Sequence, residues 1–129
     1  MASYQTVYEA IGGEQKVREL VEAFYPRVQA HPDLKDLFPA DIIPVMEKQY
    51  LFLTQFLGGP ALYSEQHGHP MLRARHIPFP ITPTRANAWL QCMEAALDEV
   101  NITGLARDHI WNRLVMTAHH MVNQPEDQE

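Results

Sequence analysis

The sequence is poor in the features that mark secreted, membrane or nucleic-acid-binding proteins. Cys92 is the only cysteine, so no disulfide can form within the chain, which suits a reducing compartment. No apolar run reaches the roughly 18 residues that a membrane-spanning helix needs, and no basic segment leads into an apolar run at the N-terminus. Ten basic residues against 16 acidic ones give a net charge of −6, and the basic residues form no run that would bind nucleic acid. We therefore expect a cytoplasmic protein that binds neither membranes nor nucleic acids.

The alternation of apolar and polar residues that is typical of β-strands also occurs nowhere in the chain. Apolar residues recur instead at spacings of three and four, which is the pattern of one face of an α-helix. A chain of 129 residues, 46% of them apolar, is long enough for one domain, 1–129, with one core. The predicted fold class is therefore all-α, with five or six helices and one long irregular segment. The polar tail, 123–129, is expected to fray.

Apolar spacing predicts where the main helices lie, and a proline interrupts one of them. A short pattern over Tyr4–Ile11 is followed by longer ones over Val17–Val28, Val45–Leu57, Trp89–Val100 and Trp111–Val122. Pro26 falls inside the second pattern, where its ring clashes with the preceding turn and its missing N–H removes a hydrogen bond. We expect that helix to kink near residues 23–25 or to break there.

Residues 67–89 are rich in histidine and proline and contain no acidic residue. They hold three of the seven histidines, and no Asp or Glu occurs between Glu65 and Glu94. Arg73 and Arg75 make the segment locally cationic in a chain whose net charge is negative. A long irregular connection in a small domain is usually functional. This one indicates a binding site for a metal, an anion, or a cofactor that is both.

His76 is the best candidate for an axial haem ligand, because a neutral imidazole can hold haem iron in that position. It follows the two arginines, which could pair with haem propionates, and apolar residues flank it. Two other interpretations stay open. His76 could be a surface histidine in a loop. It could also join His67 and His69 in a three-histidine zinc site with an open coordination position.

Three hydrogen-bond donors lie on otherwise apolar helical faces: Tyr25, Gln49 and Trp89. Buried polar groups need partners, and each of these donors could satisfy a backbone carbonyl. If the three instead converge, they form a pocket suited to a small polar or anionic ligand such as dioxygen with superoxide character.

These residues occur in an order that resembles the group II truncated haemoglobins, the two-on-two α-helical globins. The resemblance runs from about Tyr4 to Val122. Its elements are Gly12-Gly13, Phe24-Tyr25, Leu37-Phe38-Pro39, Lys48-Gln49, Phe52-Leu53, Gly58-Gly59-Pro60, Tyr63, the run from His67 to His76, Phe79 and Trp89. Each piece is weak alone, but their order and spacing are highly specific.

The resemblance implies a two-over-two helical sandwich around haem b, with His76 as the proximal ligand of the iron. It assigns Tyr25, Gln49 and Trp89 to the distal side and Lys48, Tyr63 and Arg75 to the propionates. The remaining haem contacts that it implies are apolar: Phe38, Val45, Phe52, Leu53, Leu72 and Phe79. Val45 stands at the distal gate, where globins often have a polar residue, so ligand stabilisation rests on the three donors. Pro26, directly after Tyr25, is not required by the motif and could shift the Tyr25 hydroxyl.

The implied function is reversible binding of dioxygen at histidine-ligated iron, with high affinity and slow release. Carbon monoxide, nitric oxide and peroxide are the other small ligands expected at such a site. An alternative is an enzyme on the same haem, either a peroxidase or a nitric oxide-detoxifying oxidoreductase, which would depend on an external reductant. A further alternative without haem is a zinc-binding helical interaction module. A monomer or a homodimer is expected.

Overall fold

The computed structural model describes residues 6–71, 74, 76–77 and 79–125, and every regular element within these ranges is helical. The prediction of an all-α fold is therefore confirmed. The elements are α1 (Val7–Ile11), α2 (Glu14–Ala30), the 3-10 helix η1 (Lys35–Leu37), α3 (Ile43–Phe56), α4 (Leu62–His67), α6 (Pro83–Glu99) and α7 (Gly104–Met121). No helix in the described part of the chain is long and apolar enough to cross a membrane.

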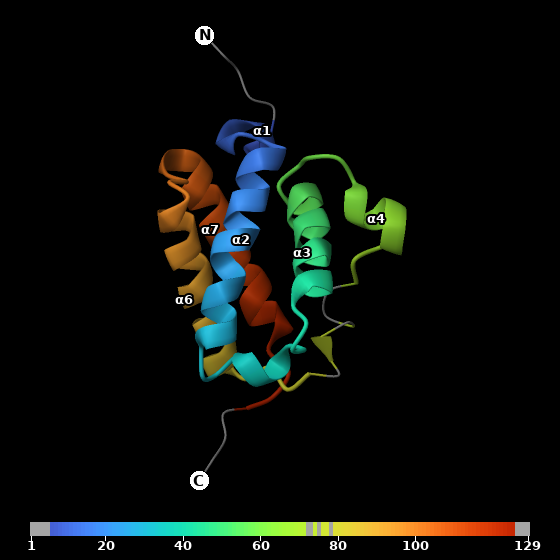
Figure 1. Ribbon diagram of the computed structural model, residues 1–129, viewed down its shortest axis with the longest axis vertical. Helices are drawn as coiled ribbons and strands as arrows, with labels where there is room; N and C mark the ends of the chain where they lie inside the picture. The colour runs from blue at the N-terminus through green and yellow to red at the C-terminus, as the bar shows by residue number, and fades with distance from the viewer. Residues whose placement is uncertain (1–5, 72–73, 75, 78, 126–129) are drawn as a thin grey trace.

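Four long helices form two packed pairs. Helix α2 packs against α3 and also against α6, and α6 packs against α7 (Figure 1). The short helix α1 contacts α7, and α4 lies beside α3 on the outer side of the bundle. This arrangement is the two-over-two sandwich that the resemblance implied, with α2 at its centre.

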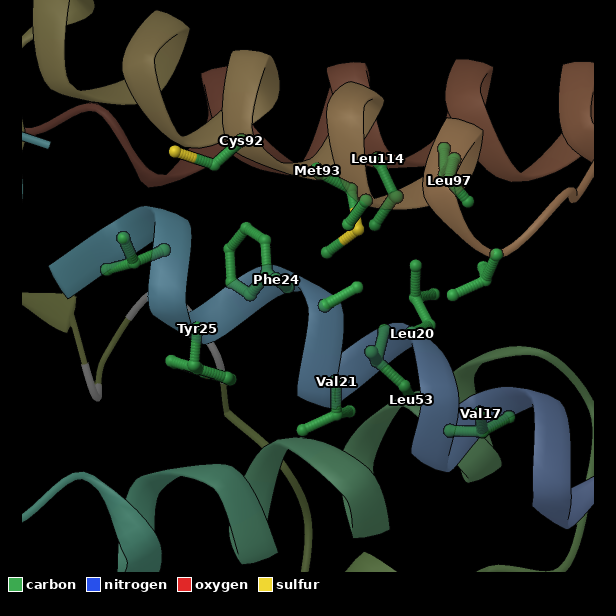
Figure 2. Packing of buried hydrophobic residues seen from close by; sticks show 14 of the residues in the cluster. Val17, Leu20, Val21, Phe24, Tyr25, Leu53, Cys92, Met93, Leu97 and Leu114 are labelled. Atoms are coloured by element: carbon green, nitrogen blue, oxygen red, sulfur yellow. The ribbon is translucent and has the colours of Figure 1, made fainter. Parts of the chain in front are cut away.

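The apolar face of α2 supplies much of the core. Val17, Leu20, Phe24 and Val28 are all at most 1% exposed, as their helical spacing predicted. Figure 2 shows Phe24 pointing from α2 towards Met93 of α6, whereas Tyr25 points towards the α3 side. Consecutive residues of α2 therefore contact opposite halves of the sandwich.

Helix α2 continues through Pro26, so the alternative in which it breaks there is wrong. The proline is exposed on the outer surface. The guanidinium of Arg27 donates to the Ala23 carbonyl at 2.7 Å, in the turn that contains the proline, and pairs with Glu99 at 2.8 Å. These two contacts tie the turn to the end of α6 and help to keep it helical.

The expectation that the chain frays from residue 123 is also wrong at its first two positions. The backbone N–H groups of Asn123 and Gln124 both donate to the Ile81 carbonyl, at 3.0 and 3.2 Å. The Ile81 N–H in turn donates to Asn123 Oδ1 at 3.0 Å. The chain therefore remains attached to the irregular segment after α7 ends. Residues 126–129 lie outside the described ranges.

Cys92 is a buried core residue of α6 and is expected to react slowly with thiol reagents. Burial raises the pKa of its thiol, and the nearby Arg27 charge lowers it by less. At neutral pH the reactive thiolate is therefore scarcer than in an exposed cysteine. Titration of the native chain with a disulfide reagent should be much slower than titration in denaturant. Equal rates would contradict the buried position.

Candidate functional site

A mostly apolar cavity of about 270 Å³ lies within the helical sandwich. Its wall includes residues of α2, α3, α6 and α7, together with parts of α4 and the irregular segment before α6. Among the sequence-predicted site residues, those on this wall are Tyr25, Phe38, Val45, Lys48, Gln49, Phe52, Leu53, Tyr63, His76 and Trp89. Ten residues from several segments of the chain thus share one cavity.

His76 reaches the cavity wall from the irregular segment and is only partly exposed. Two donors hold its backbone carbonyl: the Phe79 N–H at 2.9 Å and Asn123 Nδ2 at 3.1 Å. An imidazole at the edge of an apolar cavity, fixed through its own backbone, has the surroundings that an axial metal ligand requires.

The three predicted donors line the same cavity, from three different helices. Tyr25 projects from α2, Gln49 from α3 and Trp89 from α6. None of the hydrogen bonds among the described residues involves these three side chains. The interpretation in which each donor satisfies a backbone carbonyl is therefore not supported. Donors on a cavity wall that have no partner among the described residues are available to a ligand bound in the cavity.

Aromatic contacts fix the directions of two of these donors. The Phe24 ring lies edge-on to Tyr25 at 4.9 Å and to Trp89 at 5.2 Å, measured between ring centroids. The Tyr25 ring also meets Phe38 at 6.2 Å. Burial raises the pKa of the Tyr25 hydroxyl above its ordinary value, so the group stays protonated and can donate at neutral pH.

The polar side of the cavity wall carries Lys48 and Tyr63, which the resemblance assigns to propionates. Tyr63 is held by its helix: Gln55 of α3 accepts from the Ser64 N–H at 2.9 Å and donates to the Ser64 hydroxyl at 2.8 Å. Arg85 also lines the cavity and was not predicted. It is the third arginine of the acid-free segment, which was the signal available in the sequence. Its guanidinium donates to the Pro80 carbonyl at 2.7 Å.

Among the described residues, one predicted contact, Phe79, does not lie on the wall. The Phe79 ring is 46% exposed and lies outside the set of residues that line the cavity. Leu72 and Arg75, like Arg73, lie outside the described residues.

The three-histidine zinc site is wrong. No group of three His, Cys, Asp or Glu side chains able to hold a metal ion occurs in residues 6–71, 74, 76–77 and 79–125. His67 and His69 are exposed, whereas His76 lines the cavity. The His69 ring accepts a hydrogen bond from the Met71 N–H at 3.1 Å through Nδ1, so it stabilises a turn.

Comparison with known proteins agrees with this geometry. The sequence model of the bacterial-like globin family matches residues 6–123. The group 2 truncated haemoglobin YjbI of Bacillus subtilis (strain 168) is 55% identical over 127 residues, which cover 98% of this chain and 96% of that protein. The chain belongs to the group II truncated haemoglobins.

Solved structures show the same fold as this globin. The group II truncated haemoglobin from Bacillus anthracis superposes with a TM-score of 0.96 at 54% identity, over 98% of each chain. The truncated oxygen-avid haemoglobin from Bacillus subtilis gives a TM-score of 0.90 at 56% identity, over 92% of this chain and 100% of the other. The two-on-two fold predicted for this globin is thus confirmed.

The cavity fits the haem that the family implies. The described part of the wall offers one imidazole, an apolar lining, a lysine, and donors without a partner among the described residues. These are the surroundings that a flat apolar ring with an iron ligand and two carboxylates needs. Lys48 is exposed, so it can reach a carboxylate at the cavity mouth without losing its hydration.

Proposed function

We propose that this globin holds haem b through His76 and binds dioxygen reversibly, with high affinity and slow release. One observation carries the proposal: His76 and the donors Tyr25, Gln49 and Trp89 line a single apolar cavity, and the donors have no partner among the described residues. The same site would accept carbon monoxide and nitric oxide.

When bound, haem supplies the iron at which a diatomic ligand is held. His76 would hold the iron through a ring nitrogen, and Lys48 and Tyr63 would pair with the two carboxylates of the haem. Phe38, Val45, Phe52 and Leu53 would pack against the ring and exclude water. Arg75, Leu72 and Phe79 remain candidate contacts on sequence grounds alone.

The three donors account for the proposed affinity. A hydrogen bond to a charged partner contributes roughly 1.5–3 kcal/mol, so two such bonds to a partly charged ligand would slow its release by about two orders of magnitude or more. Val45 carries no polar group and leaves this role to Tyr25, Gln49 and Trp89. The similarity to a haemoglobin described as oxygen-avid supports this part of the proposal.

The composition of the chain supports the proposed cellular location. Its single cysteine and acidic charge favour the cytoplasm, and a monomer or homodimer needs no further partner for ligand binding. An external reductant would keep the iron ferrous.

An absorption spectrum of the purified protein, reduced and then exposed to carbon monoxide, tests the proposal. We expect a strong Soret band that shifts when carbon monoxide is added, followed by slow oxygen release in a stopped-flow measurement. A chain that stays colourless after haem is added would contradict haem binding. Rapid oxygen release would contradict the donor pocket and leave haem binding intact.

A further inference from the structure

We propose that Asn123, just after the end of α7, is a positioning residue that fixes the proximal histidine. The inference rests on the proposed role of His76 as the axial ligand. It concerns a residue that the sequence pattern placed in a frayed tail and that does not itself line the cavity.

The side-chain amide of Asn123 is fully engaged by the segment that carries His76. Its Nδ2 donates to the carbonyls of His76 and Phe79, at 3.1 and 3.0 Å. Its Oδ1 accepts from the Ile81 N–H at 3.0 Å. Two backbone bonds, from Asn123 and Gln124 to the Ile81 carbonyl, lie next to this amide. An asparagine side chain has two donor hydrogens and one carbonyl oxygen, and here both kinds of group are used.

These bonds matter because the described residues between His76 and the start of α6 form no regular element. Backbone groups that lack helix or sheet partners must find others, and here a side chain from beyond α7 supplies three of them. The His76 carbonyl is held from two sides, by the Phe79 N–H at 2.9 Å and by Asn123. The position of the His76 backbone is therefore set relative to α7.

Helix α7 also lines the cavity, through Leu114, Thr117, Ala118 and Met121. The end of this helix thus determines where the imidazole stands relative to the wall that it faces. Groups that orient a metal ligand without touching the metal typically change affinity or activity by about 10- to 100-fold when they are removed. Asn123 has the geometry of such a group, although it acts through the backbone of the ligand.

The test compares Asn123→Ala, Asn123→Asp and the control Gln124→Ala. Asn123→Asp keeps an oxygen for the Ile81 N–H, loses both donors and places a negative charge beside the His76 and Phe79 carbonyls. Gln124→Ala keeps its backbone bond to Ile81 and removes an exposed side chain. The readouts are the iron–histidine stretching band in the reduced, unliganded protein and the rate of haem loss to an acceptor globin.

We expect both Asn123 variants to shift or broaden the iron–histidine band and to lose haem about 10-fold faster or more, and the Gln124 variant to match the parent protein. Unfolding of the haem-free chains is measured alongside. A lower unfolding midpoint with an unchanged band and unchanged haem loss would show a purely structural contact and overturn the inference. If Asn123→Ala fails to fold, Asn123→Asp decides between these results. If His76→Gly leaves the iron–histidine band unchanged, His76 is not the ligand of the iron.

Discussion

Replacing His76 with glycine is expected to weaken haem binding by two orders of magnitude or more and to abolish the iron–histidine band of the reduced protein. The substitution removes the one imidazole among the described residues of the cavity wall, and an imidazole is the side chain proposed to hold the iron. Titration of the haem-free chain with haem, followed at the Soret band, measures the loss of affinity. Added imidazole should restore an iron–imidazole band, because the deleted side chain leaves room for a free imidazole to bind.

His69→Gly is the matched control for this variant. His69 belongs to the same segment but is exposed, and its ring serves a turn through the Met71 N–H. Its removal should leave haem affinity and the band within about twofold of the parent protein, as is usual for exposed positions away from special features. The reverse result, in which His69→Gly loses haem and His76→Gly keeps it, would show that His69 and not His76 holds the iron.

The helices that form the sandwich could be predicted because their apolar spacing is regular. The residues of α2 from Val17 to Val28 illustrate this: every position on the predicted face is buried. Prediction failed where side-chain contacts, some of them with another element, hold the backbone in place. Pro26 signals a break when α2 is considered alone, but Arg27, with its contact to Glu99 of α6, supplies bonds that the local sequence does not reveal.

The same limit applies to the site. That His76, Tyr25, Gln49 and Trp89 line one cavity could be predicted from the resemblance, because each motif keeps its order along the chain. Asn123 could not be identified, since its partners His76 and Ile81 lie more than 40 residues away and a lone asparagine in a polar tail carries no pattern. The His67-x-His69 spacing was misleading because it is a pattern without a shared site. Spacing in the sequence does not show where a side chain points, and these two side chains do not join His76 in a metal site.

Replacing Tyr25 with phenylalanine is expected to raise the oxygen dissociation rate by about 10- to 150-fold. This range corresponds to the loss of one hydrogen bond of roughly 1.5–3 kcal/mol to a partly charged ligand. The ring, its contact with Phe24 and its burial are retained, so the change is confined to the hydroxyl. Stopped-flow release of oxygen measures the rate directly, and an unchanged rate would remove Tyr25 from the donor set.

Tyr50→Phe controls for the loss of a tyrosine hydroxyl elsewhere. Tyr50 is also buried, but it lies outside the cavity wall and stacks beneath the Arg18 guanidinium. Its variant should release oxygen at the parent rate. Trp89→Phe should accelerate release on its own. In the double variant Tyr25→Phe/Trp89→Phe, the increase in the oxygen dissociation rate should be smaller than the product of the two single increases. This is expected if both donors serve the same ligand atom, because such neighbours are coupled.

The pH dependence of release provides an independent test of the same hydroxyl. An ordinary tyrosine is half ionised near pH 10, and an ionised hydroxyl can no longer donate. Burial raises the pKa of Tyr25, so the donor is retained as the pH rises through that value, and slow release should persist above about pH 10. An acceleration that begins near pH 9 in the parent protein, and is absent in Tyr25→Phe, would mean that the hydroxyl is exposed to water. A flat profile in both proteins, at rates that differ by the expected factor, would be the behaviour of a buried donor that acts on the ligand.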